Sequence, residues 1–318
     1  MKITTLTANP CIDRTLVVEE IRRGKSHRVQ KTLLDFSGKG INVALAASAL
    51  GAEVTAICLA HEDGAAKRFF RENPALTPVL VPTVGNARIN TKLFESGSGQ
   101  MTELNETGEV VGEEQVIGLR QAVQDALPQT DVLVLAGSVP PGVSPVFYKQ
   151  LGLLAKQRGV PFLLDASGEL LRQGMEAAPT LIKPNAEEYE ATFGVTPKPT
   201  ESFCKECRQM LDRYDIPYAI VSMGEAGALL IGPYDAWYSE PVHIDVKGVQ
   251  GAGDSMVAGI AWAIANGRSL GGELLRVAVA CAHASLELPG TQMCDAAGME
   301  KKLDHVPLYQ LGQWMPRR

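Results

Sequence analysis

The stretches DVLVLAG (131–137), VPFLLDA (160–166), TLIKPN (180–185) and YAIVSMG (218–224) decide the fold. Each is a short, almost continuously apolar run, and segments with helical patterning separate one run from the next. Apolar strands that alternate with helices pack into a parallel sheet that is covered on both faces. The sequence therefore predicts an α/β fold of three layers, α/β/α, with a mostly parallel central sheet.

Four other expected strands differ from these because many of their residues are polar. They lie at residues 15–18, 29–34, 87–95 and 101–105, and the last two form a hairpin around SGSGQ (96–100). A strand buried on both faces does not accept so many polar residues. We therefore place these strands in a separate small β-sheet, a lid.

Composition excludes several classes of protein. The chain has 318 residues, of which 45% are hydrophobic and 21% charged, as in a globular protein. A net charge of −6 argues against a nucleic-acid binder, and the sequence contains no apolar run long enough for a membrane span. The start, MKITTLTANPCIDR, lacks the apolar region of a signal peptide, and six cysteines are too few for a disulfide framework. We expect a cytoplasmic protein.

The segment GVQGAGDS (248–255) runs directly into a long apolar helix. Glycines at a helix start let backbone N–H groups converge on an anion, and the helix dipole favours negative charge there. Asp254 alone could be an N-cap, but capping does not require the glycines around it. The spacing matches neither the Walker motif nor the dinucleotide fingerprint.

Three further motifs contain candidate binding residues. SGKGIN (37–42) places glycines and Lys39 at a second helix start. Asn185 and Glu188 lie three apart, so on a helix they share a face and could hold a hydrated Mg²⁺, although locally an N-capped acidic helix start is the simpler explanation. SMGEAG (222–227) is a turn that lets the backbone approach a flat ligand.

In this order the motifs resemble those of the ribokinase-like sugar kinases of the phosphofructokinase B family. The resemblance covers essentially the whole chain, so we expect one kinase domain over residues 1–318, with the lid strands inserted from about 13–36 and 86–106. The motifs that carry it are TANPCID, SGKGINVA, ARINTK, GSVPPGVSP, LLDASGE, LIKPNAEE, VSMGEAGAL and GAGDSMVAG.

The resemblance implies a role for each matching residue. Asp254 resembles the base that removes the proton from the sugar hydroxyl. The anion hole for the transferred phosphoryl group is matched by the amides of Gly251, Ala252 and Gly253. The residues that match the family's sugar-contacting positions are Asp13, Gly38, Lys39 and Asn42. Arg28 and Arg88 match the positions that bind the phosphate already on the substrate, and Lys92 could join them in lining a phosphate pocket. Nucleotide-side positions are matched by Lys183, Asn185, Ser222, Gly224 and Gly227, and the magnesium-associated element, acting through water, by Asn185 and Glu188.

One motif departs from the family pattern. The family has a hydroxyl residue and a valine before G-A-G-D, where this chain has Val249 and Gln250, so a minor nucleotide or cation contact differs.

We expect Asp254 to be ionised near neutral pH because the helix dipole favours the charged form that a base needs.

The expected activity is ATP- and Mg²⁺-dependent phosphorylation of a ketose monophosphate. Fructose 1-phosphate is expected because ARINTKL and SGKGIN most resemble the 1-phosphofructokinase subgroup, with tagatose 6-phosphate and fructose 6-phosphate as alternatives. A non-catalytic binding protein on the same fold is a further alternative, against which the intact Asp254 argues. A nicotinamide dehydrogenase is excluded because TANPCID replaces the glycine-rich fingerprint after the first strand. Exposed edges of the lid strands predict a homodimer.

Overall fold

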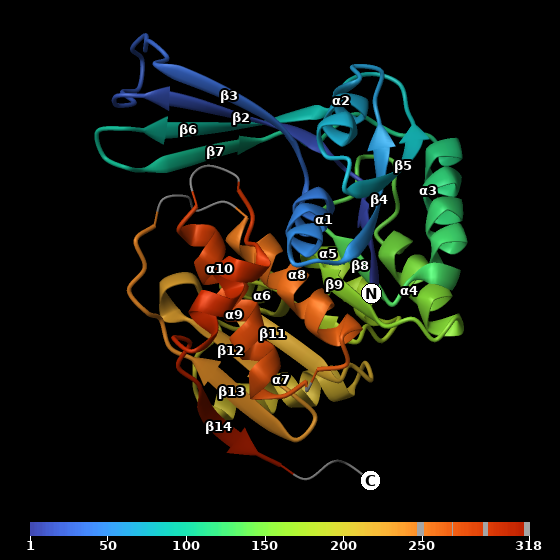
Figure 1. Cartoon of the computed structure of the whole chain (residues 1–318), viewed down its shortest axis with the longest axis vertical. Helices are drawn as coiled ribbons and strands as arrows, with labels where there is room; N and C mark the ends of the chain where they lie inside the picture. The colour runs from blue at the N-terminus through green and yellow to red at the C-terminus, as the bar shows by residue number, and fades with distance from the viewer. Residues whose placement is uncertain (247–250, 269, 289–291, 315–318) are drawn as a thin grey trace.

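This computed structural model describes residues 1–246, 251–268, 270–288 and 292–314. A large central sheet forms the middle layer (Figure 1). In the described residues its strands follow one another in space as β14 (Tyr309–Gln313), β13 (Asp235–Ser239), β12 (Ala228–Ile231), β11 (Tyr218–Ser222), β10 (Leu181–Ile182), β9 (Phe162–Asp165), β8 (Val132–Ala136), β1 (Lys2–Thr7), β4 (Glu53–Ala60) and β5 (Leu76–Pro82). Neighbouring strands from β11 to β5 run parallel, which confirms the predicted sheet.

Helices cover both faces of this sheet, each with its own apolar core. One face carries α1 (Lys39–Ala49), α2 (Ala65–Glu72), α8 (Ala252–Ala265), α9 (Gly272–Leu286) and α10 (Ala296–Leu303). The other carries α3 (Glu113–Ala126), α4 (Phe147–Gln157), α5 (Gly168–Met175), α6 (Ala186–Phe193) and α7 (Glu201–Asp212). In β8, Val132 and Val134 point into the first core and Leu133 and Leu135 into the second, because successive side chains of a strand point to opposite faces. This two-sided burial explains why the strand is apolar throughout.

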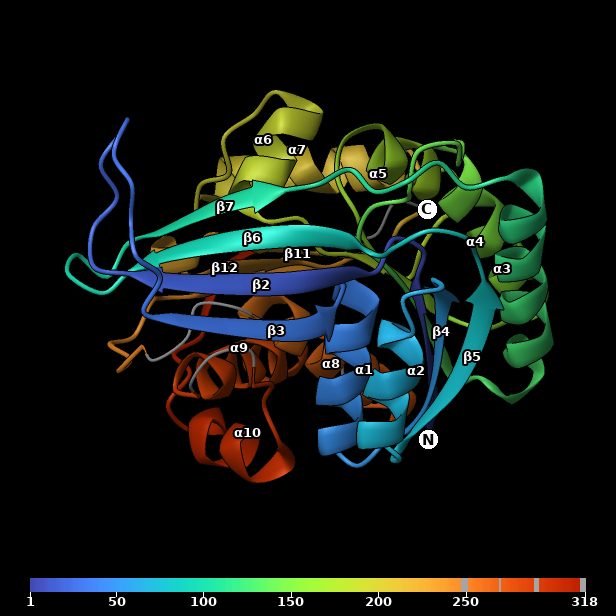
Figure 2. The same cartoon turned by 90° about the horizontal axis from the view of Figure 1, so that it is seen from above.

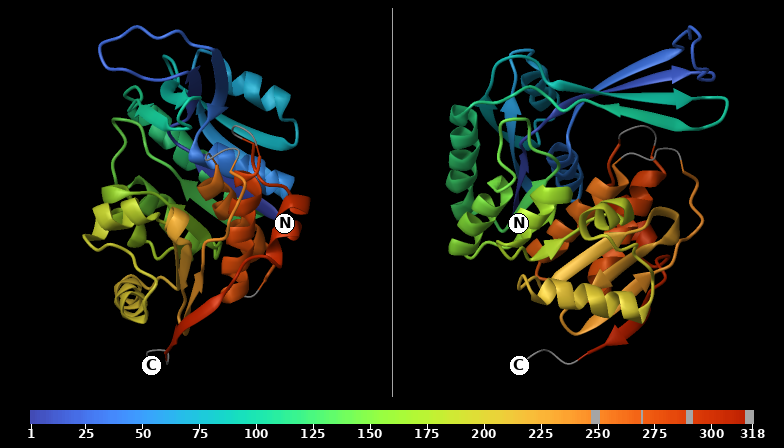
Figure 3. Two further views of the ribbon diagram at one scale, coloured as in Figure 1. Left: turned by 90° about the vertical axis from the view of Figure 1, so that its left-hand side faces the viewer. Right: turned by 180° about the vertical axis from the view of Figure 1, so that it is seen from behind.

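The four partly polar strands form a separate sheet, as predicted. Its order is β3 (Lys31–Ser37), β2 (Cys11–Val18), β6 (Arg88–Glu95) and β7 (Met101–Asn105). Figure 2 shows these strands side by side, and Figure 3 shows them extending beyond the helical layers. The boundaries differ from the expected ones, since β2 begins at Cys11 rather than at residue 15 and β3 spans 31–37 rather than 29–34.

Other elements depart from the sequence pattern. The strands β12, β13 and β14 extend the central sheet in antiparallel fashion at the edge farthest from the small sheet (Figure 1). Two short 3₁₀ turns lie at Leu127–Gln129 and Gly224–Ala226. Across the described part of the chain, no helix has both the length and the apolar character needed to span a membrane.

Candidate active site

A cavity of about 1200 Å³ lies where the carboxyl ends of the central strands meet the small sheet. It brings together motif residues that are far apart in the sequence, as expected at the carboxyl edge of an α/β sheet. The predicted site residues that line it are Asp13, Gly38, Lys39, Asn42, Arg88, Lys183, Asn185, Glu188, Ser222, Gly224, Gly227, Gly251, Ala252, Gly253 and Asp254.

Arg28 is the exception, since it does not line the cavity of this chain, and its contact with the substrate's phosphate stays a prediction. It belongs to the exposed loop between β2 and β3, at the far tip of the small sheet, and is not among the described residues that line the cavity (Figure 2). Val249 and Gln250 lie outside the described residues.

Asp254 lies in the first turn of α8, and its carboxylate is held by a neutral amide. The side-chain nitrogen of Asn42 donates a 2.8 Å hydrogen bond to Oδ2 of Asp254, and the Ser37 hydroxyl donates to the oxygen of the same Asn42 amide at 3.2 Å. Burial raises the pKa of Asp254 to about 6, although Lys39 and the Asn42 hydrogen bond lower it. Burial thus outweighs the helix dipole, which favours the charged form. A group with this pKa is still about nine-tenths ionised at pH 7.

The backbone before Asp254 is arranged to receive an anion. Gly251 is the N-cap of α8 in a left-handed conformation with φ 78°, and no side chain caps this helix start. The N–H groups of the first turn therefore have no partner within the helix and point out of its end. Lys183 adds positive charge there, since its Nζ lies 3.9 Å from the point where a Cβ on Gly253 would be.

A buried charge network lies next to this helix start. Asp165, at the end of β9, accepts from Nζ of Lys39 at 3.3 Å and from Nζ of Lys183 at 3.4 Å. Burial would raise the pKa of Asp165, but the two lysines outweigh it and hold the pKa below its usual range. The motifs assigned Asp165 no role, although an aspartate at the carboxyl end of an apolar strand indicates a ligand site in an α/β sheet.

Asn185 and Glu188 form the helix cap that the sequence left open as an alternative. The Asn185 side chain accepts the Glu188 N–H at 2.7 Å, and the Asn185 N–H donates to Oε2 of Glu188 at 2.9 Å. The second carboxylate oxygen, Oε1, accepts from Nζ of Lys39 at 3.1 Å. In the described part of the chain no three His, Cys, Asp or Glu residues form a metal cluster.

The small sheet supplies the other wall of the cavity. Side chains of Asp13, Asn90 and Lys92 point to the same face, because the register of β2 and β6 pairs Asp13 with Asn90 and Thr15 with Lys92. Nζ of Lys92 lies 2.8 Å from Oδ2 of Asp13, and both residues are buried. Arg88 is fixed nearby, with its guanidinium bonded to the carbonyls of Asn9 and Glu106 and to Oδ1 of Asn90.

The opposite end of the cavity lies at the turn after β11. Gly227 has φ 84°, and a Cβ there would be 2.1 Å from the Ser239 carbonyl, so only glycine fits this close approach. Across from the turn, α9 contributes Val279, Ala282, His283 and Leu286 to the lining. The sequence treated His283 as structural. Burial lowers its pKa to about 4, so it lines the cavity as a neutral ring.

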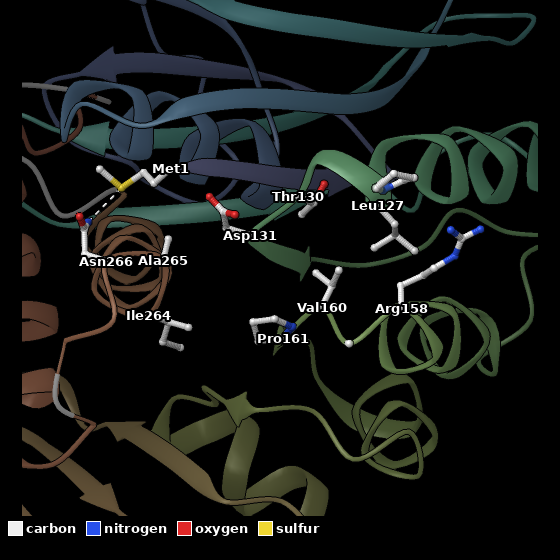
Figure 4. A pocket seen from close by; sticks show the side chains of 12 residues that line it. Met1, Leu127, Thr130, Asp131, Arg158, Val160, Pro161, Ile264, Ala265 and Asn266 are labelled. Atoms are coloured by element: carbon white, nitrogen blue, oxygen red, sulfur yellow. Dashed lines mark hydrogen bonds between the residues drawn. The ribbon is translucent and has the colours of Figure 1, made fainter.

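A second cavity, of about 770 Å³, lies at the other end of the central sheet (Figure 4). It is lined by residues that precede β1, β8 and β9 and by the end of α8. Figure 4 shows Asp131 and Arg158 apart from each other, with a single bond drawn from Asn266 to Met1. None of the predicted site residues lines it.

Comparisons with known proteins show the family of the chain. The family model for pfkB family carbohydrate kinases matches residues 6–297. The 1-phosphofructokinase of Escherichia coli (strain K12) is 31% identical over 314 residues, which make up 96% of this chain and 98% of that protein. The Vibrio cholerae 1-phosphofructokinase is 32% identical over 265 residues, 82% of each chain.

Solved structures show the same fold. Phosphofructokinase-2 from Escherichia coli in complex with potassium has a TM-score of 0.85 at 26% identity, covering 96% of this chain and 98% of that one. A Thermotoga maritima protein has a TM-score of 0.88 at 24% identity, covering 98% and 100%. Because the family model spans most of the chain and the relatives match nearly end to end, the chain belongs to the pfkB family of carbohydrate kinases.

Proposed function

We propose that this chain transfers the terminal phosphoryl group of ATP to fructose 1-phosphate, which gives fructose 1,6-bisphosphate and ADP. The observation that carries the proposal is the placement of Asp254. Its carboxylate lies in the first turn of α8, between the wall formed by the small sheet and the turn after β11. A base at that position can serve a sugar hydroxyl on one side and a polyphosphate on the other.

In the proposed reaction, Asp254 accepts the proton of the attacking hydroxyl. The hydroxyl oxygen bonds to the terminal phosphorus while the bond from that phosphorus to the ADP oxygen breaks. Because the transferred group carries charge on its equatorial oxygens, the enzyme needs mainly positioning and charge neutralisation. The amides of Gly251, Ala252 and Gly253 and the ammonium of Lys183 would supply both.

The residues present fit a bound Mg²⁺. This ion prefers carboxylate oxygens and keeps several waters. Glu188 is directed into the cavity by its capping box, and Oδ2 of the buried Asp165 has no hydrogen-bond partner among the described residues. We propose that these two carboxylates hold Mg²⁺, with Asn185 reaching it through water. When bound, the ion would neutralise charge on the nucleotide phosphates.

Asp13 and Asn90 offer hydrogen-bond partners for sugar hydroxyls. Arg88 and Lys92 line the cavity and offer positive charge for the phosphate that the sugar already carries. Arg88 also has a hydrogen-bond donor for it, because a guanidinium has five N–H groups and the bonds described above use four of them. The choice of fructose 1-phosphate rests on the relatives of 31–32% identity, which are 1-phosphofructokinases. Fructose 6-phosphate is the second candidate because phosphofructokinase-2, 25% identical, was solved in complex with it.

We also propose a homodimer formed through the small sheet, and a cytoplasmic location that rests on the sequence alone. Strand alternation places Leu16, Leu34, Leu93 and Leu104 on the face away from the cavity. Leu34 is 64% exposed and Leu104 57%, so a second copy could cover apolar side chains on this face. One solved form of phosphofructokinase-2 is a tetramer, and sedimentation would distinguish the two assemblies. A monomer at micromolar concentration would contradict the proposed dimer.

The test of the reaction measures ADP release with Mg-ATP and fructose 1-phosphate, fructose 6-phosphate or tagatose 6-phosphate in parallel. Asp254→Asn serves as the blank. A dominant rate with fructose 1-phosphate that the variant abolishes would support both the substrate and the base. Preference for a 6-phosphate would overturn the substrate, and the absence of turnover with all three would overturn the proposed activity.

A further inference from the structure

Lys39 occupies the place between the two carboxylates that would hold the divalent cation. It is the first residue of α1, and its Nζ lies 3.3 Å from Oδ1 of Asp165 and 3.1 Å from Oε1 of Glu188. The side chain passes Gly137, where an added Cβ would be 3.4 Å from the Cβ of Lys39. Its exposed fraction is 35%, whereas that of the Asp165 side chain is 1%. The ammonium therefore bridges the carboxylates from the open side of the cavity.

Both carboxylates are held in position by groups other than Lys39. The backbone N–H of Asn185 fixes Oε2 of Glu188 within the capping box. Nζ of Lys183 lies 3.4 Å from Oδ1 of Asp165, and β9 carries that residue in the buried sheet. Removing the Lys39 ammonium would therefore leave two carboxylates in place, with one positive charge fewer beside them.

An ammonium and a divalent cation compete for such oxygens. Both are attracted by the same carboxylates, and they repel each other at the short distance that sharing would require. We propose that Lys39 is a resident counter-ion that closes the carboxylates of Asp165 and Glu188 to a lone divalent cation, so that the cation enters only with the nucleotide. This inference rests on the proposed kinase function.

The nucleotide would remove the competition. A polyphosphate brings more negative charge than its bound Mg²⁺ neutralises, and phosphate oxygens accept from lysine as readily as carboxylates do. The flexible, partly exposed stem of Lys39 can turn from Glu188 to such an oxygen. Lys183 is less suited to this exchange because only 5% of its side chain is exposed.

The test uses Mn²⁺ alone and nucleotide-free protein, with unbound Mn²⁺ followed by electron paramagnetic resonance. The variants are Lys39→Met, which keeps the apolar stem, and Lys39→Arg, which keeps the charge. We expect Lys39→Met to bind one Mn²⁺ at least about tenfold more tightly than the wild type, since about 1.4 kcal/mol is tenfold. Lys39→Arg should match the wild type. Adding Glu188→Gln to Lys39→Met should abolish the gain.

Equal Mn²⁺ affinity in the wild type and Lys39→Met would overturn the proposal. So would a gain that persists in the Lys39→Met/Glu188→Gln double variant, because the ion would then bind elsewhere. If circular dichroism shows that Lys39→Met does not fold, Lys39→Gln takes its place. The titration needs no turnover, so the two proposals fail separately. Tighter Mn²⁺ binding by Lys39→Met together with a wild type that releases no ADP would refute the kinase function alone. ADP release by the wild type without tighter Mn²⁺ binding by Lys39→Met would refute the counter-ion role alone.

Discussion

Replacing Asp254 by asparagine should inactivate the protein and at the same time stabilise its fold. The residue is only 9% exposed, and burial raises the pKa of its carboxyl group to about 6. In the unfolded chain the pKa of an aspartate is about 3.9. Because the folded state binds the proton more tightly than the unfolded state, the ionised carboxylate costs stability.

The size of this cost follows from the shift. About two pKa units at ~1.36 kcal/mol per unit correspond to about 3 kcal/mol. The cost is fully present above about pH 6 and disappears below about pH 4, where both states are protonated. Asparagine keeps an oxygen that can accept from Asn42. We therefore expect Asp254→Asn to gain about 3 kcal/mol in unfolding free energy at pH 7.5 and about half of that at pH 5, while kcat falls by about 10²–10⁴.

Urea unfolding at the two pH values measures the gain, and ADP release measures the loss of activity. Glu225→Gln is the matched control, since Glu225 also lines the cavity but is exposed, and its unfolding free energy should change by less than about 0.5 kcal/mol. Asp254→Asn with no added stability at pH 7.5 would refute the reasoning. A gain that is the same at pH 5 would refute it as well, because it would not come from the charge.

Three other changes have definite expected outcomes. Asn42→Leu removes the 2.8 Å hydrogen bond that stabilises the ionised Asp254, so the acid limb of the kcat/KM profile should move up from about pH 6 by about one unit, as measured between pH 5 and 9. Lys92→Met leaves the buried Asp13 carboxylate unpaired and should lower the unfolding free energy by about 3–5 kcal/mol, which urea unfolding would show, whereas adding Asp13→Asn should restore most of it. Gly251→Ala adds a Cβ about 2.5 Å from Met293 at a residue with φ 78°, so kcat with Mg-ATP should fall by at least about 10²-fold, and wild-type kcat would contradict an anion hole there.

The sequence predicted the central sheet well because its strands are buried on both faces, as β8 shows. It did not predict β5, which contains Pro78 and Pro82, since such prolines are tolerated only at a sheet edge and the sequence alone does not reveal the edge. The strand β14, YQLGQ, is partly exposed and mostly polar, so no apolar pattern marks it.

Some residues of the candidate site could be predicted from the sequence and others could not. Residues in glycine-rich turns at strand ends were identified because their local sequence is unusual. Other features depend on packing between segments that are distant in the sequence, so no local pattern reveals them. They are the ion pair of Lys92 with Asp13, the contacts of Asp165 with Lys39 and Lys183, and the position of His283 in the cavity wall. The direction of the pKa shift of Asp254 was also beyond the sequence, because burial decides it.

The partners of the buried aspartates in the cavity argue for the choice of base. Of those in the described residues, Asp13 is paired with the ammonium of Lys92, and Asp165 with that of Lys39. Asp254 is held instead by the neutral amide of Asn42. The lysines Lys183 and Lys39 hold the pKa of Asp165 below its usual range and weaken it as a base, whereas burial beside a neutral partner keeps the pKa of Asp254 raised. The same cavity therefore contains carboxylates that hold cations and one that is suited to accept a proton, and the latter lies at the helix start that receives the phosphoryl group.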